Sequence, residues 1–518
     1  MEALSNLMQG FAGALTPMNL LWVVLGCLLG TAVGVLPGLG SSMAVALLLP
    51  MTFALDPTAA FIMFAGVYFG GLFGDSTMAI LMNTPGQASA IASTFEGHKM
   101  AASGRAPQAL ATAAIGAFIG GMVASVIVVF LAPTLAELST IFGPAEYFAL
   151  ALFAFIATSS VVSESILKGL ASLVLGLGIA VVGIDAISGI ERFTMGTPQL
   201  FDGISLVTVT VAVLALGEVF YVATRVRREP TDLKTRAAGR PWLSRSEFRD
   251  ALPAWGRGTA IGLPFGVIPA GGAEVPTFLA YDVERRLDRR RKKPMFGKGA
   301  IRGLAAPEAA GNSTTGMAMG ALLALGLPIS ATAAIMLAAF RQYGLQPGPL
   351  LFDRNPDLVW ALLASFFIAM VVLLIINLPF AQLWAKLLLI PKHYLYASIT
   401  LFCGLGIYAT SGAVFDLLLL LGIAIIGFLM RRYDYPVAPL MIGMVLGPLA
   451  ETSLRDALLS SVGDFSILVS SPITWAIYLL LAIVVLFAVR KALITRNLRR
   501  RSKKAEPAAE PEAEQITQ

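Results

Sequence analysis

Charged residues are scarce in this chain. Only 13% of its 518 residues are Asp, Glu, Lys or Arg, whereas a soluble globular protein carries about 25%. The mean hydropathy is +0.79, and several uncharged runs reach the roughly 20 residues that a membrane-spanning helix needs. These runs cover residues 109–132, 312–340, 358–385, 394–415 and 465–489. The composition therefore excludes a string of soluble domains and predicts a membrane protein.

Cysteine and histidine are also rare. The two cysteines, Cys27 and Cys403, lie in apolar segments and have no paired spacing, so they indicate neither a disulfide framework nor a metal site. The two histidines, His98 and His393, are too few for a histidine-based metal centre. We therefore expect no cofactor.

Positive charge is missing from the start of the chain, where the first Lys or Arg is Lys99. Without a basic segment near the N-terminus, we expect no cleaved signal peptide. Positive residues gather instead between residues 225 and 257 and in the run 284–294. Such clusters are typical of cytoplasmic loops in membrane proteins, so the net charge of +6 does not indicate nucleic-acid binding.

A glycine- and proline-rich stretch interrupts the first apolar segment at residues 30–42 (GTAVGVLPGLGSS). Pro37 removes a backbone donor and clashes with the preceding turn, so a helix should break there. Gly38 and Gly40 admit backbone angles that are closed to other residues. Inside a bilayer such a break is tolerated only where it is buried in protein or lines a wet cavity. The free N–H groups of a half-helix starting near Ser41 and Ser42 favour an anion there.

The same stretch occurs again at residues 262–272 (GLPFGVIPAGG). Four positions repeat at one constant offset: Gly30, Gly34, Pro37 and Gly40 match Gly262, Gly266, Pro269 and Gly272. A polar island repeats too, since residues 74–77 (GDST) match residues 311–314 (GNST) at a slightly larger offset. Chance matches are the alternative in a chain with 50 Gly and 29 Pro, but two matches in one order favour a duplication. Paired interruptions of this kind indicate the binding site of a transporter.

We therefore predict an all-α, polytopic membrane protein of about 12 membrane segments, built from two repeats. Each repeat should contain a broken-helix hairpin and a helix that unwinds at the polar island, with further breaks near Pro85 and Pro328. Because only the second hairpin has Lys and Arg on both flanks, inverted repeats are the simplest account, while parallel repeats stay open. The expected domains are residues 1–224 (first membrane repeat), 225–250 (basic cytoplasmic linker), 251–489 (second membrane repeat) and 490–518 (disordered cytoplasmic tail).

Several longer motifs make the chain similar to a known family, the large membrane subunit of the bacterial tripartite tricarboxylate transporters. These motifs are GTAVGVLPGLG, YFGGLFGDSTMAILMNTPG (68–86), EGHKMA (from Glu96), GIDAISGIERFTMG (183–196), PEAAGNSTTG (307–316), LALGLP (323–328) and LGPLAE (446–451). The resemblance implies a multi-pass secondary transporter of the bacterial inner membrane that imports citrate or other carboxylates. It also implies a small membrane subunit, a periplasmic solute-binding protein and a driving gradient of Na+ or H+.

The breaks and islands supply the candidate binding groups. A carboxylate needs N–H donors and hydroxyls at fixed positions, which broken-helix N-termini provide, and a coupling cation needs oxygen ligands. We predict the substrate site at Pro37, Gly38, Gly40, Ser41, Ser42, Asn83, Thr84, Pro269, Gly271 and Gly272. We predict the cation site at Asp75, Ser76, Thr77, Asn312, Ser313 and Thr314.

Three acidic residues near these motifs have two interpretations each. Asp75 lies in an apolar stretch, where an acid indicates function by default, but it would also suit the cap of a helix starting at Ser76. Glu274 follows the second break, and we expect it mainly to cap the half-helix that begins there. Glu308 either lines the site or lies in a loop at the membrane face, and we favour the loop.

Two other classes of function are the alternatives. Gly74 and Asp75 faintly resemble the signature of intramembrane aspartyl proteases, but those need a second Asp, and the matching island has Asn312. A serine hydrolase would need a histidine near a serine, and both histidines lie in polar loops. We therefore predict that the chain is not an enzyme. A passive anion channel is the second alternative, although duplicated broken helices favour alternating access.

Overall fold

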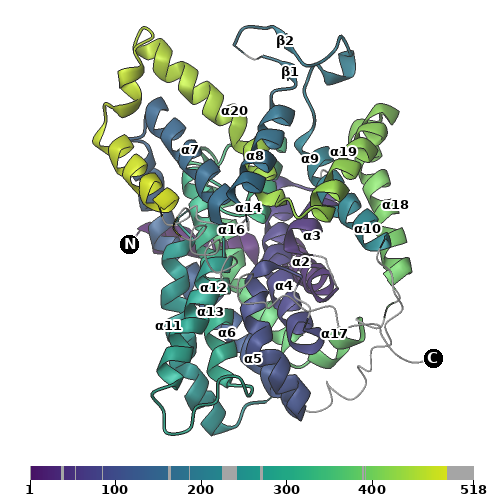
Figure 1. Ribbon diagram of the computed structural model, residues 1–518, viewed down its shortest axis with the longest axis vertical. Coiled ribbons are helices and arrows are strands. Elements are labelled where there is room, and N and C mark those ends of the chain that lie inside the picture. Colours follow the sequence, from purple (N-terminus) through teal and green to yellow (C-terminus); the bar gives the residue numbers. More distant parts are fainter. Residues whose placement is uncertain are drawn as a thin grey trace, which may run out of the picture.

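The computed structural model describes residues 2–36, 40–52, 54–83, 86–161, 165–185, 187–224, 242–268, 272–387, 390, 392–486 and 490. These residues are almost entirely helical, which confirms the predicted all-α class (Figure 1). A small sheet pairs β1 (Gly183–Ile184) antiparallel with β2 (Glu191–Arg192), and Figure 1 shows this hairpin extending from the upper end of the molecule.

The first half of the chain forms the helices up to α10. In chain order they are α1 (Glu2–Ala14), α2 (Pro17–Val35), α3 (Ser41–Thr52), α4 (Pro57–Met82), η1 (Ala88–Ala90), α5 (Ile91–Met100), η2 (Ala101–Arg105), α6 (Ala106–Ser139), α7 (Pro144–Val161), α8 (Ile166–Ala180), η3 (Pro198–Leu200), α9 (Leu206–Thr210), η4 (Val211–Leu216) and α10 (Gly217–Ala223).

The second half begins with a helix that starts inside the predicted linker. In chain order its helices are α11 (Arg245–Phe265), α12 (Glu274–Asp288), α13 (Ile301–Leu325), α14 (Ala331–Gln342), α15 (Pro349–Arg354), α16 (Pro356–Asn377), α17 (Ala381–Leu387), α18 (Lys392–Ser411), α19 (Val414–Arg432), α20 (Val437–Ser460) and η5 (Phe465–Val469). A further apolar helix covers Pro472–Leu486. The rest of the predicted linker, residues 225–241, and the tail from residue 491 lie outside the described residues.

Seven of the described helical segments are long and apolar enough to cross a membrane, which supports a polytopic membrane protein. They are Pro17–Val35, Pro57–Met82, Ala88–Glu137, Leu206–Ala223, Pro356–Asn377, Val414–Arg432 and Val437–Ser460. Four shorter apolar helices cover Ser41–Thr52, Pro144–Ser160, Ile166–Ala180 and Pro472–Leu486. The predicted total of about 12 segments also counted the two hairpins and several shorter apolar runs, which the seven long segments do not all include.

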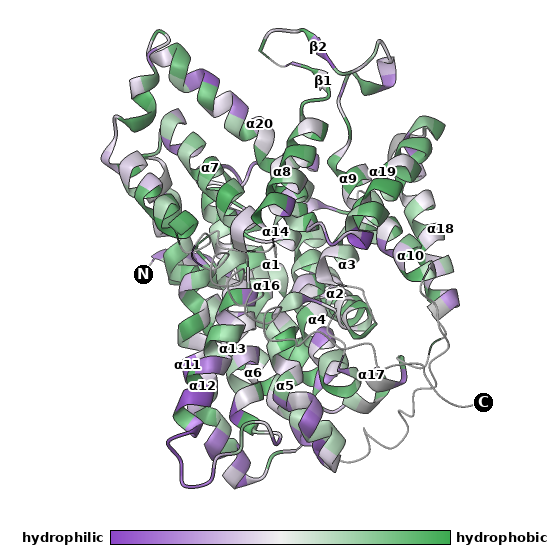
Figure 2. Cartoon of the chain, viewed as in Figure 1, coloured by the Kyte–Doolittle hydropathy of each residue, from purple (hydrophilic) through white to green (hydrophobic). Residues whose placement is uncertain are grey.

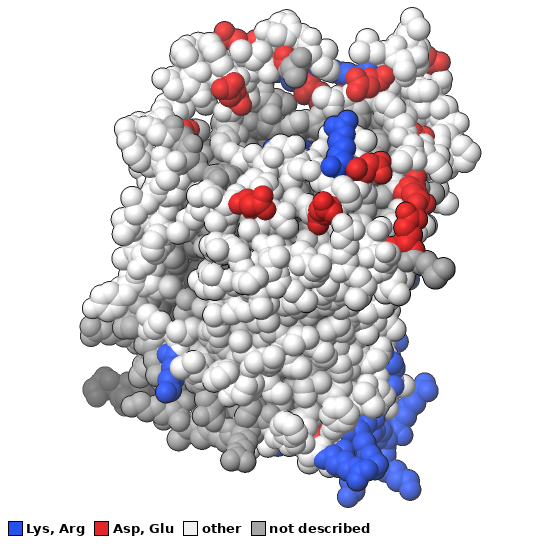
Figure 3. Space-filling model, turned by 180° about the vertical axis from the view of Figure 1, so that it is seen from behind, with Lys and Arg blue, Asp and Glu red and all other residues white. Residues whose placement is uncertain are grey.

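The surface pattern agrees with a membrane-embedded middle. Figure 2 shows apolar residues along most helices and polar residues concentrated at the lower ends of α11 and α12. On the face drawn in Figure 3, Lys and Arg gather at one end, several Asp and Glu lie near the other, and the zone between carries almost no charged side chains. An uncharged belt between charged ends is what a bilayer requires of a lipid-facing surface.

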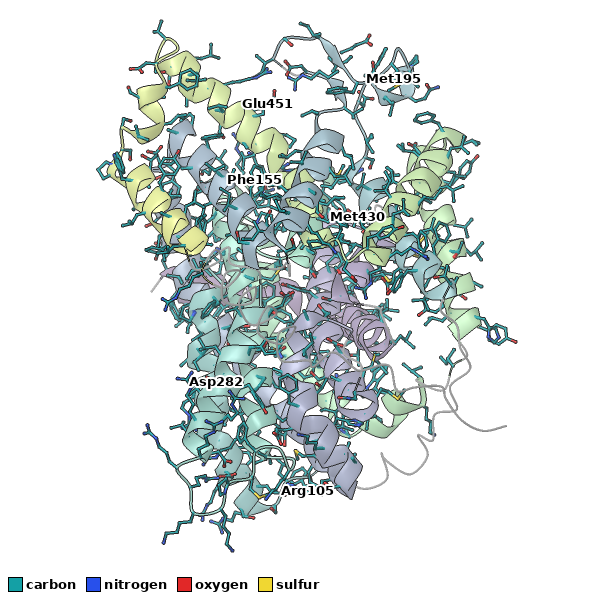
Figure 4. The ribbon with its side chains drawn as sticks, in the orientation of Figure 1. Arg105, Phe155, Met195, Asp282, Met430 and Glu451 are labelled. Carbon is teal, nitrogen blue, oxygen red and sulfur yellow. The ribbon has the colours of Figure 1, made fainter. Side chains whose placement is uncertain are left out.

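The β1–β2 hairpin is fixed to α20 by charged side chains at the end of the molecule where Figure 4 labels Met195 and Glu451. Arg192 pairs with Asp185 at 2.7 Å and with Glu451 at 2.9 Å, while Arg455 pairs with Asp185 at 2.9 Å. The Ser188 hydroxyl, Arg455 and Arg192 together hold the pKa of the Asp185 carboxyl well below its usual range. The hairpin is therefore an ordered part of this end of the molecule.

At both predicted hairpins one helix ends and another begins. Helix α2 ends at Val35 and α3 begins at Ser41, while α11 ends at Phe265 and α12 begins at Glu274. The residues predicted to cause the breaks, Pro37, Gly38, Pro269 and Gly271, lie outside the described residues. The described flank of the second break includes Gly272, whose φ of +75° belongs to the left-handed region that glycine adopts freely.

Each hairpin packs against a long helix through glycines that leave no room for a side chain. A Cβ added to Gly30 of α2 would lie 2.5 Å from the carbonyl oxygen of Val67 in α4. A Cβ added to Gly262 of α11 would lie 2.2 Å from the carbonyl oxygen of Ala310 in α13. The same contact recurs one helical turn before and after each glycine, pairing Gly26 with Met63, Gly34 with Gly71, Gly258 with Ala306 and Gly266 with Thr314. Both hairpins therefore use one backbone-to-backbone packing mode.

This packing corrects the predicted register of the second helix in each repeat. The step in the numbering from Val67 to Ala310, which we call the long-helix offset, is larger than the step from Gly30 to Gly262, which we call the hairpin offset. The helix ends agree, because the left-handed C-caps Asn83 and Gly326 are separated by the same long-helix offset. Asp75 therefore corresponds to Ala318, and its predicted equivalence to Asn312 is wrong. The short GDST and GNST islands match by composition and not by place.

The polar islands are not unwound, so this part of the prediction is wrong as well. Helix α4 continues through Asp75 to Met82, and α13 continues through Asn312 to Leu325. The two helices end at Asn83 and Gly326 in left-handed conformation, directly before Thr84-Pro85 and Leu327-Pro328 in the sequence. The chain breaks where proline forbids a further turn, whereas buried small polar residues keep their helical hydrogen bonds.

The glycine packing makes a prediction about stability. We expect Gly262→Ala to lower the free energy of unfolding by about 1–3 kcal/mol, because the new methyl group must push α11 away from the Ala310 carbonyl. The measurement is thermal unfolding of the purified, detergent-solubilised protein. The matched control is Gly256→Ala on the same helix, where an added Cβ meets nothing within 4 Å. Equal unfolding midpoints for the two variants would contradict the packing argument.

Candidate functional site

A cavity of about 190 Å³, which we call the central cavity, lies beside the described flanks of both breaks. Its lining from the first half of the chain is Ser42, Tyr68, Leu72, Gln87, Ala88, Ser89 and Thr158. Its lining from the second half is Gly272, Ala273, Glu274, Thr314, Thr315, Ala318, Ile329, Ser330, Ala331, Thr332 and Ala438. Both hairpins and the segments after both long helices therefore meet at one space.

The lining residues come in corresponding pairs. At the long-helix offset, Leu72, Gln87, Ala88 and Ser89 correspond to Thr315, Ser330, Ala331 and Thr332, and all eight line the cavity. At the hairpin offset, Ser42 corresponds to Glu274, and both line it. Corresponding residues of the two halves of the chain therefore line the central cavity.

Hydroxyl contacts join the two halves at the cavity wall. The Ser41 hydroxyl donates to Gln87 Oε1 at 3.1 Å and lies 3.3 Å from the hydroxyl oxygen of Thr332. The Tyr68 hydroxyl lies 3.3 Å from that of Ser330, which in turn accepts the N–H of Ala333 as the N-cap of α14. These contacts hold the starts of α3 and α14 against each other, although they lie far apart in the sequence.

The electrostatic character of the central cavity comes from helix ends. No Lys or Arg is among its described lining residues, and Glu274 is the one acidic residue among them. Helices α3, α12 and α14 all begin at this space, with Ser41, Glu274 and Ala331 as their first residues. The first N–H groups of a helix lack intrahelical acceptors and carry partial positive charge, so convergent N-termini favour an anion.

Two polar atoms of the described lining have no hydrogen-bond partner. The hydroxyl of Thr158 on α7, whose residue is 1% exposed, is one of them, and the Nε2 amide of Gln87 is the other. A buried donor without a partner costs free energy unless something else binds it. Both groups can donate a hydrogen bond, which again suits an oxygen-rich ligand.

The structure brings part of the predicted substrate site to this cavity. Ser42 and Gly272 line it, Ser41 forms the contacts described above, and a Cβ on Gly40 would lie 3.2 Å from the side chain of Gln87. Asn83 is the exposed C-cap of α4 and does not line the cavity. Pro37, Gly38, Thr84, Pro269 and Gly271 lie outside the described residues, so for them the assignment stays a prediction.

The predicted cation-site residues are divided among three places. Asp75, Ser76 and Asn312 line a small second space beside the central cavity. Thr77 lines a separate one facing α6. Ser313 donates to the carbonyl oxygens of Thr259 and Ala310, so its hydroxyl serves helix packing.

Thr314 combines packing with a place at the central cavity. Its hydroxyl donates to the carbonyl oxygens of Gly262 at 2.9 Å and Ala310 at 2.8 Å, which joins α13 to α11. The residue also lines the central cavity. The predicted cation group is therefore not one site in this structure, and its role as a set of ligands stays a prediction.

Asp75 caps a different segment from the one expected. It lies inside α4, so it cannot cap a helix starting at Ser76, and that alternative is wrong. Its Oδ1 accepts the N–H of Gly86 at 2.5 Å and its Oδ2 accepts the N–H of Gln87 at 3.1 Å. Asp75 therefore fixes the segment that leads from α4 to η1 and carries Gln87 into the cavity wall.

The structure also shows the positions of Glu274 and Glu308. Glu274 is the first residue of α12, which confirms its predicted position at the start of the half-helix. Glu308 does not lie in a loop, so the favoured interpretation is wrong: it is 4% exposed within α13, and its Oε2 accepts the Ser76 hydroxyl at 2.7 Å. The surrounding alanines and small polar residues read as a loop in the sequence, but in a membrane helix such residues pack closely.

Sequence reasoning predicted breaks near Pro85 and Pro328 but did not identify the cavity-lining residues that follow them. A third pair of matching motifs, residues 85–90 (PGQASA) and 328–333 (PISATA), recurs at the long-helix offset. In both motifs the third residue carries an amide or a hydroxyl, the fourth is alanine and the fifth carries a hydroxyl. This signal could have identified Gln87, Ser89, Ser330 and Thr332. Nothing comparable indicated Thr158, because it comes from a helix outside both motifs.

The fold and the site define an all-helical, polytopic membrane protein with a polar cavity between two similar halves. The chain belongs to the tripartite tricarboxylate transporter TctA family, whose model matches residues 20–442. It is 40% identical over 478 residues, 91% of this chain and 93% of the relative, to the Agrobacterium vitis "Uncharacterized 52.8 kDa protein in TAR-I ttuC' 3'region". It is 38% identical over 208 residues, 40% of this chain and 85% of the relative, to the "Uncharacterized protein in TAR-II ttuC' 3'region" of the same organism. No solved structure matches the chain.

The unpartnered Thr158 hydroxyl makes a prediction about substrate affinity. We expect Thr158→Val to raise the half-saturation concentration for citrate uptake roughly two- to tenfold, because the cavity loses one hydrogen-bond donor at nearly constant volume. Thr210→Val is the control, since that hydroxyl bonds to Leu206 within its own helical segment, at 2.6 Å. The measurement is initial uptake of labelled citrate by cells expressing each variant at equal levels. Wild-type affinity in Thr158→Val would remove Thr158 from the substrate site.

Proposed function

We propose that this chain is the large transmembrane subunit of a binding-protein-dependent secondary transporter that imports a tricarboxylate or a related carboxylate. In this proposal the chain lies in a bacterial inner membrane and works together with a small membrane subunit and a periplasmic solute-binding protein. Membership of the TctA family supports the class. The central cavity, with convergent helix N-termini from both repeats, is the observation that carries the assignment of the substrate site.

The chemistry of the cavity suits a carboxylate. The lining offers hydroxyls, the Gln87 amide and backbone N–H groups at helix starts, which are the donors a carboxylate accepts from. The described lining has no Lys or Arg to neutralise a multiply charged anion. Burying such an anion without a positive partner costs free energy. Co-transport of a cation offsets that charge, so we propose that uptake is coupled to a Na+ or H+ gradient.

The repeated architecture supports alternating access and argues against a permanent channel. Hydroxyl contacts such as Ser41–Thr332 join the two halves at the cavity wall, and we propose that a movement of one half against the other releases the substrate. A transporter family also argues against the hydrolase alternative. The described residues contain no group of three or more His, Cys, Asp or Glu that could hold a metal ion.

Reconstitution tests this proposal. Proteoliposomes containing the chain and its small subunit, with the binding protein and labelled citrate outside, should accumulate citrate above the external concentration when an inward Na+ or proton gradient is imposed. Omitting the binding protein should abolish accumulation. Equilibration without accumulation would identify a channel, and uptake that ignores both gradients would contradict secondary transport.

The distribution of positive charge predicts the orientation of the two hairpins. We expect a cysteine at Arg289, in the basic loop after α12, to be cytoplasmic, and a cysteine at Ala54, between α3 and α4, to be periplasmic. Both positions are exposed, and both native cysteines are buried, which keeps background labelling low. An impermeant maleimide should therefore label Ala54→Cys in intact spheroplasts and Arg289→Cys only after permeabilisation. Labelling of both from one side would rule out inverted repeats.

A further inference from the structure

A second and much smaller cavity, of about 20 Å³, lies next to the central cavity, and we call it the acidic cavity. Its lining is Leu72, Asp75, Ser76, Ser89, Ala90, Ser93, Thr277, Pro307, Glu308, Gly311 and Asn312. Leu72 and Ser89 line both spaces, so only one layer of side chains separates them. The acidic cavity lies between α4, α5, α12 and α13, and it is large enough for one water-sized occupant.

Two carboxylates face this space without a positive partner. Asp75 is 1% exposed and Glu308 is 4% exposed, and they come from different repeats. No Lys, Arg or His is among the described lining residues, and neither acid forms an ion pair with any described residue. Two buried carboxylates close together cannot both stay charged unless a cation neutralises part of the charge.

The hydrogen bonds show which oxygens are unsatisfied. Both oxygens of Asp75 accept backbone N–H groups, and Oε2 of Glu308 accepts the Ser76 hydroxyl. Oε1 of Glu308 and Oδ1 of Asn312 have no hydrogen bond of normal geometry among the described residues, although the two residues are only 4% and 3% exposed. The Ser93 hydroxyl is close enough to interact with the Glu308 carboxyl group. Asn312 uses its amide nitrogen to donate to the Glu308 carbonyl oxygen at 3.0 Å, so its oxygen is the free end. Every unsatisfied atom of the cavity's described lining is therefore an oxygen acceptor.

We propose that the acidic cavity binds one Na+ ion, with Glu308 Oε1 and Asn312 Oδ1 as its principal ligands and the hydroxyls of Ser93 and Thr277 completing the shell. A small hard cation prefers oxygen ligands and needs about the volume of one water molecule. Because backbone N–H groups already bind both oxygens of Asp75, Oε1 of Glu308 is the carboxylate oxygen that is free to bind the ion. This assignment rests on the proposed transport function, for which the ion would be the coupling cation.

The position of the site explains how an ion would act on the substrate. Asp75 lines the acidic cavity and also holds the backbone of Gly86 and Gln87, and the Gln87 side chain lines the central cavity. Ser76, beside Asp75 on α4, holds Glu308 of the other repeat. An ion bound to Glu308 therefore stabilises the arrangement of α4 and α13 that presents Gln87 to the carboxylate.

Thermal unfolding of the purified full-length chain in detergent tests the site without substrate, partner subunits or a gradient. NaCl should raise the unfolding midpoint of the wild type in a saturable way when choline chloride holds total salt constant. Glu308→Gln should raise the half-effective Na+ concentration at least tenfold, and Asn312→Ala should raise it several-fold. The matched control is Glu146→Gln, since Glu146 is also buried but only accepts the N–H of Gly143, and it should respond like the wild type.

The outcomes separate this inference from the proposed function. No Na+ response in the wild type overturns the site, and a midpoint that follows pH but not Na+ identifies a proton site in its place. If Glu308→Gln does not fold, the uncharged change Asn312→Ala decides, and a wild-type Na+ response in that variant also overturns the site. The unfolding assay needs no citrate. If the Na+ response is present and depends on Glu308 while citrate uptake fails, the proposed substrate is wrong and the ion site stands.

Discussion

The architecture depends on the direct contact of helix backbones at Gly30 and Gly262. Where a methyl group would come within 2.5 Å of a carbonyl oxygen, the two helices are as close as backbones allow. Three such contacts in a row fix each hairpin helix along its partner, and this fixes the place where the hairpin breaks. The starts of α3 and α12 then lie at the same cavity, together with the segments that follow α4 and α13. The central cavity is a consequence of this spacing.

Buried polar groups connect that framework to chemistry. In a bilayer, each N–H or carboxylate must find its partner inside the protein. Asp75 satisfies the backbone after α4, and Ser76 satisfies one oxygen of Glu308 across the interface of the repeats. What is left unsatisfied around the two cavities falls into two groups: donors at Thr158 and Gln87 around the central cavity, and acceptors at Glu308 and Asn312 around the acidic one. The central cavity is therefore suited to an anion, and the neighbouring acidic cavity to a cation.

The sequence predicted the helical class, the two hairpins and the position of Glu274, because proline, glycine and apolar length act locally. It also predicted the breaks near Pro85 and Pro328, where α4 and α13 end. Its further breaks at GDST and GNST were wrong, and so was the pairing of Asp75 with Asn312, which lie at different levels of their helices. The burial of Glu308 was also missed. A run of small residues such as the one around it is typical of a loop in a soluble protein, but it forms a helix-packing surface in a membrane protein. The contribution of Thr158 depends on tertiary contact alone, which no local pattern encodes.

The described lining of the central cavity contains no Lys or Arg, and this has a consequence for turnover. A fixed guanidinium clamp would grip a carboxylate tightly and release it slowly, because the charged pair would have to be separated in a dry interior. Helix-end dipoles and hydroxyls, as at Ser41 and Ala331, give shallower binding and tolerate anions of different shape. Such a site is suited to fast release of its substrate. Selectivity between substrates then depends on the component that binds the solute first.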